Sequence, residues 1–169
     1  MQIRQARPDD AAWLSSLACE SYAAHFASIW SPRGLAAFLQ REFAPAMLLR
    51  ALAAQDQAWY VAFDADGPAG FAKVNWHRTE PGSGMQGAEL QKIYFLPGRT
   101  GRGLGAGLLA HVTAQAVARG EPHLWLNVLG PNQAAQRFYS RHGFERLGTV
   151  SFQLEDRVLD MIAMGRALG

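Results

Sequence analysis

The feature with the most chemical potential is a glycine-rich segment ahead of a helical pattern. Residues 97–107 read PGRTGRGLGAG. Backbone amides at a helix start have no partners within the helix and lie at the positive end of its dipole, so they attract anions. Glycines remove the Cβ atoms that would keep a phosphate away, and Arg99 and Arg102 add positive charge. We expect a phosphate-binding loop, although a tight turn with close helix packing explains such glycines equally well.

Three kinds of phosphate loop compete for this segment. A Walker loop ends in Gly-Lys-Ser or Gly-Lys-Thr, whereas residues 105–107 here are Gly-Ala-Gly. A dinucleotide fingerprint fits the spacing of Gly101, Gly103 and Ala106, and Glu121 stands about twenty residues beyond the first glycine. That acid should follow the next strand, however, and Glu121 precedes it. The third kind is the pyrophosphate loop of coenzyme A transferases. A nucleotide-binding redox domain therefore stays open as one hypothesis.

The elements that position this loop follow from the spacing of apolar residues. A helix is expected after Pro8, with an Asp as its cap, and another after the start signal Ser31-Pro32. Further helices are expected over residues 45–55, 103–119 and 133–141, the last capped by Asn132. Strands are expected over residues 2–7, 59–63, 69–76, 88–96, 123–128, 144–152 and 158–167. This order predicts an α/β (α+β) fold, a mixed sheet with helices packed on it.

Length and composition bound the possibilities. The chain has 169 residues, of which 49% are hydrophobic and 18% charged, which predicts one domain over residues 1–169 with a real core. The formal net charge of +2 gives no reason to expect nucleic acid, and it suits a polyanionic cofactor.

Cysteine use and the apolar runs suggest a compartment. Cys19 is the single cysteine, so no internal disulfide forms and a reducing cytoplasm is expected. We expect its thiol to be buried and inert. No His/Cys cluster has zinc spacing, so no metal is expected. No apolar run approaches the length of a membrane span, and the first residues lack the apolar core of a signal peptide. We expect a soluble, cytoplasmic protein.

Three groups of residues together resemble the GCN5-related N-acetyltransferase (GNAT) superfamily. They are residues 88–97, the Gly101–Gly105 loop, and Asn132 with Phe138-Tyr139 and Gly143-Phe144. The resemblance implies a largely antiparallel central sheet of about seven strands, helices on both faces, and a splay beside the glycine loop. More narrowly, residues 70–75, 124–126 and 148–152 are similar to bacterial spermine/spermidine acetyltransferases, which implies a polyamine acceptor.

The resemblance also implies a cofactor, acetyl-coenzyme A, and a set of residues that hold it. Backbone groups of Ile93, Tyr94 and Phe95 would receive the pantetheine arm, and Asn132 would lie near its reactive end. The pyrophosphate would lie on Gly101, Arg102, Gly103, Leu104, Gly105 and Ala106. Two positions depart from the family pattern. Thr100 stands where Gln or Arg is usual, and Asn127 lies on the strand where ribosomal-protein acetyltransferases have a Glu base.

Acyl transfer to an amine also needs groups that move protons. The resemblance makes Tyr139 the general acid, and a phenol keeps its proton at neutral pH. The competing interpretation is an aromatic that only packs in the core. Glu89 is the candidate base, because its alternation with Gln91 and Ile93 suggests a face open to substrate. A solvated strand end is the alternative. His77 is the runner-up base.

The resulting expectation is an enzyme that transfers acetyl directly from acetyl-coenzyme A to a primary amine. The acceptor would be a polyamine, another small amine or a peptide N-terminus, and a homodimer is one assembly to test. The helices before the hairpin, with Trp30, Phe38, Phe43 and Glu42, would form one wall of the acceptor site. Few acids occur there, so a polycation is not clearly favoured. A non-catalytic acyl-coenzyme A-binding sensor module is the alternative from another class.

Overall fold

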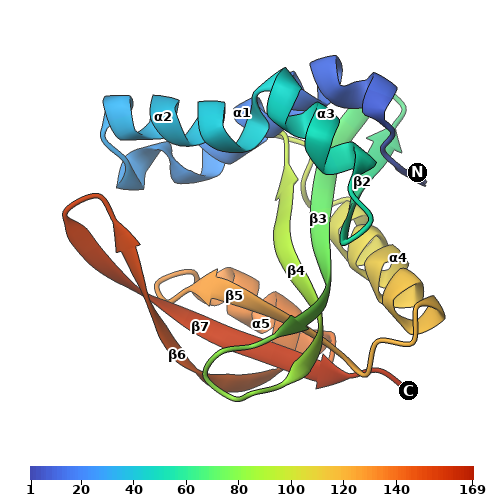
Figure 1. Cartoon of the computed structure of the whole chain (residues 1–169), viewed down its shortest axis with the longest axis vertical. Helices are drawn as coiled ribbons and strands as arrows, with labels where there is room; N and C mark the ends of the chain where they lie inside the picture. Colours follow the sequence, from blue (N-terminus) through green and yellow to red (C-terminus); the bar gives the residue numbers. More distant parts are fainter. The chain divides into compact units, whose positions relative to one another are not determined.

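The computed structural model describes the whole chain, Met1–Gly169. Seven strands form one sheet in the order β1-β2-β3-β4-β5-β7-β6 (Figure 1). The strands are β1 (Gln2–Gln5), β2 (Gln57–Asp64), β3 (Gly67–Thr79), β4 (Gln86–Phe95), β5 (His123–Leu129), β6 (Glu145–Leu154) and β7 (Arg157–Ala167). The helices are α1 (Ala11–Phe26), α2 (Pro32–Phe43), α3 (Pro45–Ala53), α4 (Leu104–Ala118) and α5 (Gln133–Arg141), with short 3-10 segments η1 (Pro8–Asp10) and η2 (Ala27–Ile29). The predicted fold class is confirmed.

One pairing in the sheet breaks its antiparallel character. β1 pairs antiparallel with β2, and β7 pairs antiparallel with both β5 and β6. β4 and β5 instead run parallel, and their register joins Ala88 to Leu124 and Glu89 to Trp125. Both strands continue beyond these two pairs. The family resemblance implied a splay beside the glycine loop, and a pairing this short is in keeping with it.

The chain divides into two compact units, and β3, β4 and α4 each contribute to both. The first unit comprises Met1–Val74 and Lys92–Val112, and the second comprises Asn75–Gln91 and Thr113–Gly169. The single domain over residues 1–169 stays a prediction. None of the helices combines the length and the apolar character that a membrane span requires.

In the first unit, helices pack on both faces of β2. Trp59 belongs to the apolar core that α1, α2 and α3 form with β2 and β3. Its neighbour Tyr60 contacts the His111 ring of α4, with 5.0 Å between the ring centroids. Successive strand residues point to opposite faces, so α4 covers the face away from α1–α3. The predicted apolar stripe of α4, from Leu104 to Ala116, is fully or almost fully buried.

In the second unit, local signals fix both ends of α5. The Asn132 side-chain oxygen accepts a hydrogen bond from the Ala135 amide at 3.1 Å, so Asn132 is the predicted N-cap. Gly143 has a φ of +85°, in the left-handed region that favours glycine at a helix end. The Phe144 amide then donates to the Tyr139 carbonyl at 3.1 Å. This closed turn gives Tyr139 a defined place at the end of α5.

Candidate active site

The glycine loop has the backbone that an anion-binding loop needs. Gly98, Gly101 and Gly103 have φ values of +76°, +86° and +75°, which side chains rarely adopt. A Cβ at any of the three would meet no atom of the chain within 4 Å, so the space beside the loop is open. The Gly107 amide bonds back to the Gly103 carbonyl at 2.9 Å. The amides of residues 104–106 therefore come before the helical hydrogen bonds of α4, where an anion is welcome.

The positive charge of Arg99 was expected to be available beside the loop, but the structure pairs it with an acid. Its guanidinium forms an ion pair with Asp64 at the end of β2, and Asp66 lies 4.0 Å away. The hydrogen bond from Arg99 is the main reason that the pKa of Asp64 lies below its usual value, and the Asp66 amide and the charge of Arg102 add to the effect. Arg99 thus ties the loop to the β2–β3 hairpin. Arg102 is exposed on the loop.

The end of β4 is fixed by close packing. Tyr94 packs its ring against three aromatic residues of the first unit, with centroid distances of 5.3 to 5.8 Å. A Cβ on Gly70 would lie 2.3 Å from the Phe95 ring, so only glycine allows this approach. The side chains of Tyr94 and Phe95 are thus used for packing. What this strand end offers a pantetheine arm is its backbone, beginning at half-buried Ile93.

His25 is a residue near this strand end that the sequence did not single out. Its Nε2 lies 3.2 Å from the Phe95 carbonyl oxygen, so a helix side chain from α1 reaches the backbone of β4. The two residues are 70 positions apart, and no local pattern could have linked them.

Tyr139 satisfies the packing interpretation, and its role as general acid stays a prediction. Only 7% of it is exposed, and its ring lies 5.3 Å from that of Phe138 and 5.5 Å from that of Phe144. Burial raises the pKa of the phenol well above its usual value, and no hydrogen bond or neighbouring charge offsets this effect. The phenol therefore keeps its proton at any physiological pH.

Glu89 is half-buried and held by a partner rather than being a freely solvated strand end. Its Oε2 accepts a hydrogen bond from the Asn75 side-chain amide at 2.9 Å, and Asn75 is only 5% exposed. Asn75 therefore orients the carboxylate. Its part was not predicted, because the pair joins two strands across 14 positions.

His77 and Glu121 contact one another, and this contact bears on the ribose-binding role that the loop spacing allowed for Glu121, while the role of His77 as a base stays a prediction. The buried Glu121 carboxylate accepts the backbone N–H of His77 at 2.9 Å, and the same oxygen lies 3.1 Å from Nδ1 of the ring. His77 has a φ of +54°, unusual for a residue with a side chain. Glu121 thus stabilises a strained backbone position and cannot serve as the ribose-binding acid of a dinucleotide fold. Its burial removes one support from the redox hypothesis.

The predicted wall of the acceptor site needs correction. Phe43 is fully buried in the core of the first unit, and Phe38 stacks on Tyr22 with 4.5 Å between centroids. Trp30 donates its indole N–H to the Tyr22 hydroxyl at 3.0 Å. Phe43 is therefore a core residue, whereas Trp30 and Phe38 are only half-buried and their place in an acceptor wall stays a prediction. Glu42 lines a pocket together with residues of α3, β2 and β3.

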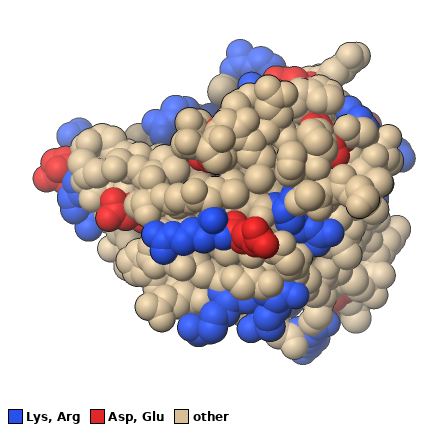
Figure 2. Space-filling view, turned by 90° about the horizontal axis from the view of Figure 1, so that it is seen from below, with Lys and Arg blue, Asp and Glu red and all other residues tan.

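The two positions that depart from the family pattern, Asn127 and Thr100, are both polar. Asn127, on β5, has a buried side-chain oxygen without a hydrogen-bond partner. Thr100 is exposed. Figure 2 shows uncharged residues over most of one face, with scattered Lys and Arg side chains of which only some lie beside Asp or Glu.

Comparisons with known proteins agree with this architecture. The model of the acetyltransferase (GNAT) family matches residues 17–144. Among solved structures, the PaiA N-acetyltransferase of Thermoplasma acidophilum in complex with coenzyme A has a TM-score of 0.74 at 20% identity, covering 98% of each chain. YncA of Salmonella typhimurium, a putative acetyltransferase solved with acetyl-coenzyme A, has a TM-score of 0.74 at 22% identity, covering 100% of this chain and 94% of that one. At these identities the likeness shows the fold.

Curated relatives match over shorter stretches. An uncharacterized N-acetyltransferase of Mycobacterium tuberculosis is 47% identical over 66 residues, which are 39% of this chain and 42% of that protein. The streptothricin acetyltransferase of Streptomyces lavendulae is 37% identical over 94 residues, 55% of this chain and 47% of that protein. The chain thus spans less than half the length of these relatives. The family model, by contrast, covers most of the chain, including the glycine loop and Tyr139, and this chain belongs to the acetyltransferase (GNAT) family.

Proposed function

We propose that this chain is an acetyl-coenzyme A-dependent N-acetyltransferase that transfers acetyl directly to a primary amine. The observation that carries the proposal is the loop of left-handed glycines that opens onto the first amides of α4. Family membership supports it, as do one relative named an N-acetyltransferase and one named an acetyltransferase. Two structures of similar fold contain coenzyme A or acetyl-coenzyme A.

The residues present fit the cofactor. The loop has open space where a Cβ would stand at Gly101 and Gly103, and Arg102 adds an exposed cation to it. A pyrophosphate would be held by these amides and by those of Leu104, Gly105 and Ala106. Backbone groups of residues 93–95 would hold the pantetheine arm. The Asn132 oxygen caps α5, so its contact with the cofactor would be made through the side-chain nitrogen.

Two residues of the second unit would move the protons. An ammonium has no lone pair, so Glu89, oriented by Asn75, would take one proton from the acceptor before its nitrogen attacks the thioester carbonyl carbon. As the carbon–sulfur bond breaks, Tyr139 would give its phenolic proton to the departing sulfur, and the attacking nitrogen would lose its second proton to solvent to leave the neutral amide. Burial keeps that proton in place until it is needed, and solvent would then return Tyr139 to its starting state.

The acceptor class is the least determined part of the proposal. A small-molecule amine is favoured by the partial match to streptothricin acetyltransferase. A polyamine or a peptide N-terminus would meet the same chemical requirement, a primary amine that Glu89 can deprotonate. We also propose a cytoplasmic location, in keeping with a single unpaired cysteine.

Release of free thiol from acetyl-coenzyme A, followed with a panel of amines, tests the proposal. The panel should contain a diamine, a polyamine, amino acids and a short peptide. Thiol release that depends on one of these amines, with the acetylated product found by mass spectrometry, is the expected result. Tight binding of coenzyme A without turnover of any amine would favour the sensor module. A chain that neither bound coenzyme A nor turned over any amine would contradict both the enzyme and the sensor hypotheses.

A further inference from the structure

One face of the sheet in the second unit is only partly covered, and the strand register shows which side chains share it. Directly paired residues of neighbouring strands point to the same face, as do residues two positions apart on one strand. Glu89 pairs with Trp125 on β5, so Glu89 shares a face with Asn127, which is half-buried. The opposite face of β5 is buried, through Leu124, Leu126 and Val128. The face that carries the candidate base is therefore the one left for a ligand.

The end of this face near Glu89 can accept hydrogen bonds. The Asn75 amide donates to one Glu89 oxygen, and a carboxylate has further acceptor sites. Asn127 has a buried side-chain oxygen without a hydrogen-bond partner. A buried acceptor that stays unpaired costs free energy, and a donor brought by a ligand would recover that cost. An ammonium carries three N–H donors, and its charge is opposite to that of Glu89.

Beyond Asn127 the same face becomes apolar. Asn127 pairs with Ala163 on β7, and Ala163 pairs with Gly148 on β6. A Cβ on Gly148 would meet no atom within 4 Å, so the space above this row of paired residues is open. The next two rows hold five apolar side chains that are half-buried or exposed, and we call them the apolar strip: Leu129, Val150, Phe152, Leu159 and Met161. The strip begins about 7 Å beyond Asn127 along the strands.

Phe152 lies at the exposed end of the apolar strip. It is 41% exposed and pairs with Leu159 across the β6–β7 hairpin. Val158 is 63% exposed and pairs with Gln153, so it lies on the opposite face of the same hairpin. Covering apolar surface removes it from water and is favourable. The strip therefore favours a hydrocarbon body, and it contains no acid with which a second ammonium could pair.

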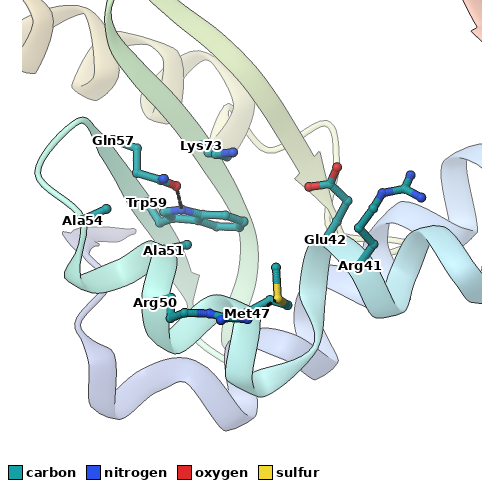
Figure 3. Close-up of a pocket in the computed structure, with 9 residues that line it drawn as sticks. All are labelled: Arg41, Glu42, Met47, Arg50, Ala51, Ala54, Gln57, Trp59 and Lys73. Carbon is teal, nitrogen blue, oxygen red and sulfur yellow. Dashed lines mark hydrogen bonds between the residues drawn. The ribbon is translucent and has the colours of Figure 1, made fainter.

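The pocket of the first unit offers an amine less. It has a volume of about 310 Å³, and side chains from α2, α3, β2 and β3 line it (Figure 3). Glu42 is the one carboxylate among its lining residues, and Nζ of Lys92 already lies 3.7 Å from the Glu42 Oε2. An ammonium would have to compete with Lys92 for this acid, whereas no cation is paired with Glu89 in the structure.

We propose that the acceptor is a small-molecule primary amine with a single ammonium and a long hydrocarbon body. The ammonium would lie near Glu89 and Asn127, and the body would cross the row of Gly148 to cover the apolar strip. A polyamine would bring a second ammonium to a strip without an acid, and a peptide would bring polar backbone groups to a strip without hydrogen-bonding side chains. This assignment rests on the proposed function, because it names the acceptor of that reaction.

Calorimetry with a matched pair of amines tests the assignment without depending on turnover. Octylamine and 1,8-diaminooctane have the same chain length and differ by a second ammonium at the far end. In the presence of coenzyme A, octylamine should bind at least about tenfold more tightly than 1,8-diaminooctane, because the far-end ammonium would leave water without a partner. Propylamine, whose body is too short to reach the strip, should bind more weakly than octylamine.

Phe152→Asp should narrow this preference to a few-fold at most. The change puts an acid beside the far end of the body, so octylamine should bind more weakly and 1,8-diaminooctane more tightly than to the parent. Phe152 is exposed, so its replacement leaves the core intact. Val158→Asp is the matched control, because it makes the same kind of change on the opposite face of the hairpin. Its affinity for both amines should equal that of the parent.

Several results of the binding experiments would overturn the assignment. Equal binding of octylamine and 1,8-diaminooctane, binding of neither, or an equal effect of Val158→Asp and Phe152→Asp would each do so. A change of oligomeric state in Phe152→Asp, measured by light scattering, would also do so, because a second copy of the chain would then cover the strip.

Thiol release separates failure of this assignment from failure of the proposed function. Acetylation of octylamine with a higher kcat/KM than 1,8-diaminooctane and propylamine supports both. Acetylation of other amines without a preference for octylamine overturns the apolar acceptor and leaves the enzyme. If octylamine binds as expected and no amine is acetylated, the proposed function fails, and the assignment of the acceptor fails with it.

Discussion

Replacing Tyr139 by Phe removes one hydroxyl and keeps the ring that contacts Phe138 and Phe144. If the hydroxyl gives its proton to the departing sulfur, turnover should fall about a hundredfold or more, the usual scale of general-acid catalysis. That is about 3 kcal/mol of transition-state stabilisation. The affinity for coenzyme A should hardly change, because the proton is needed only in the transition state.

The structure predicts little cost in stability from this change. No hydrogen bond is lost, because the phenol has none that lowers its raised pKa, so the free energy of unfolding should change by less than about 1 kcal/mol. Tyr22→Phe is the contrasting variant. It removes the acceptor of the Trp30 indole N–H, so it should cost about 1 kcal/mol of stability and leave turnover within a few-fold of the parent.

The pH dependence of the free energy of unfolding in the alkaline range gives a second test of the Tyr139 phenol. The folded chain holds the Tyr139 proton to higher pH than the unfolded chain does, whose tyrosines titrate near pH 10. The stability that this group contributes is therefore complete below about pH 10 and is lost as the pH rises further, by up to about 1.4 kcal/mol per pH unit. Tyr139→Phe should lose less stability than the parent between about pH 9 and pH 11.

The test combines thiol release under single-turnover and steady-state conditions with calorimetry for coenzyme A affinity and urea unfolding for stability. Tyr139 would be a packing residue, and the reasoning refuted, if the Phe variant turned over within a few-fold of the parent. A large loss of coenzyme A affinity would instead show that the hydroxyl acts in binding.

Three further predictions concern carboxylates. Glu89→Gln should lower the rate at neutral pH and recover part of it at high pH, where free amine is abundant; an unchanged pH–rate profile would remove Glu89 from the mechanism. Asp64→Asn should release Arg99 and raise the KM for acetyl-coenzyme A a few-fold with kcat nearly constant, and a change in kcat alone would argue against an anchoring role. Hydrogen bonding lowers the pKa of Asp10 to about 2, so the stability it contributes is present above about pH 4 and is lost as the pH falls toward 2. Asp10→Asn should therefore cost about 1 to 2 kcal/mol at pH 7 and far less near pH 2 in urea unfolding, whereas its exposed neighbour Asp9→Asn should cost little at either pH.

Local signals made much of the fold predictable from the sequence. The apolar stripe of α4 is buried as its spacing indicated. Ser31 caps α2 by accepting the Gly34 amide at 3.0 Å, with Pro32 at the first helical position. Asn132 caps α5 in the same way. In each case the information lies within a few neighbouring residues, which is the range over which caps and periodicity act.

Contacts between residues far apart in the sequence could not be predicted from it. The pair of Asp64 with Arg99 spans 35 positions, and that of His77 with Glu121 spans 44. Lys92 occupies a strand position that alternation alone does not mark as buried, and it is almost fully covered. Its burial depends on Glu42 and Phe43 at the end of α2. Such partners are set by tertiary packing, so side-chain type at each position gave no sign of them.

The single thiol gives this protein a built-in probe of its own fluctuations. Cys19, on α1, packs against the core of the first unit but is half-buried and not fully buried as expected, and this burial raises the pKa of its thiol. Only the thiolate attacks a labelling reagent, so modification should be slowed in the folded chain and faster when α1 separates from its neighbours. The labelling rate at several denaturant concentrations would measure how often this helix opens. In a thiol-release assay, the same protection keeps the enzyme's own background below one equivalent per chain.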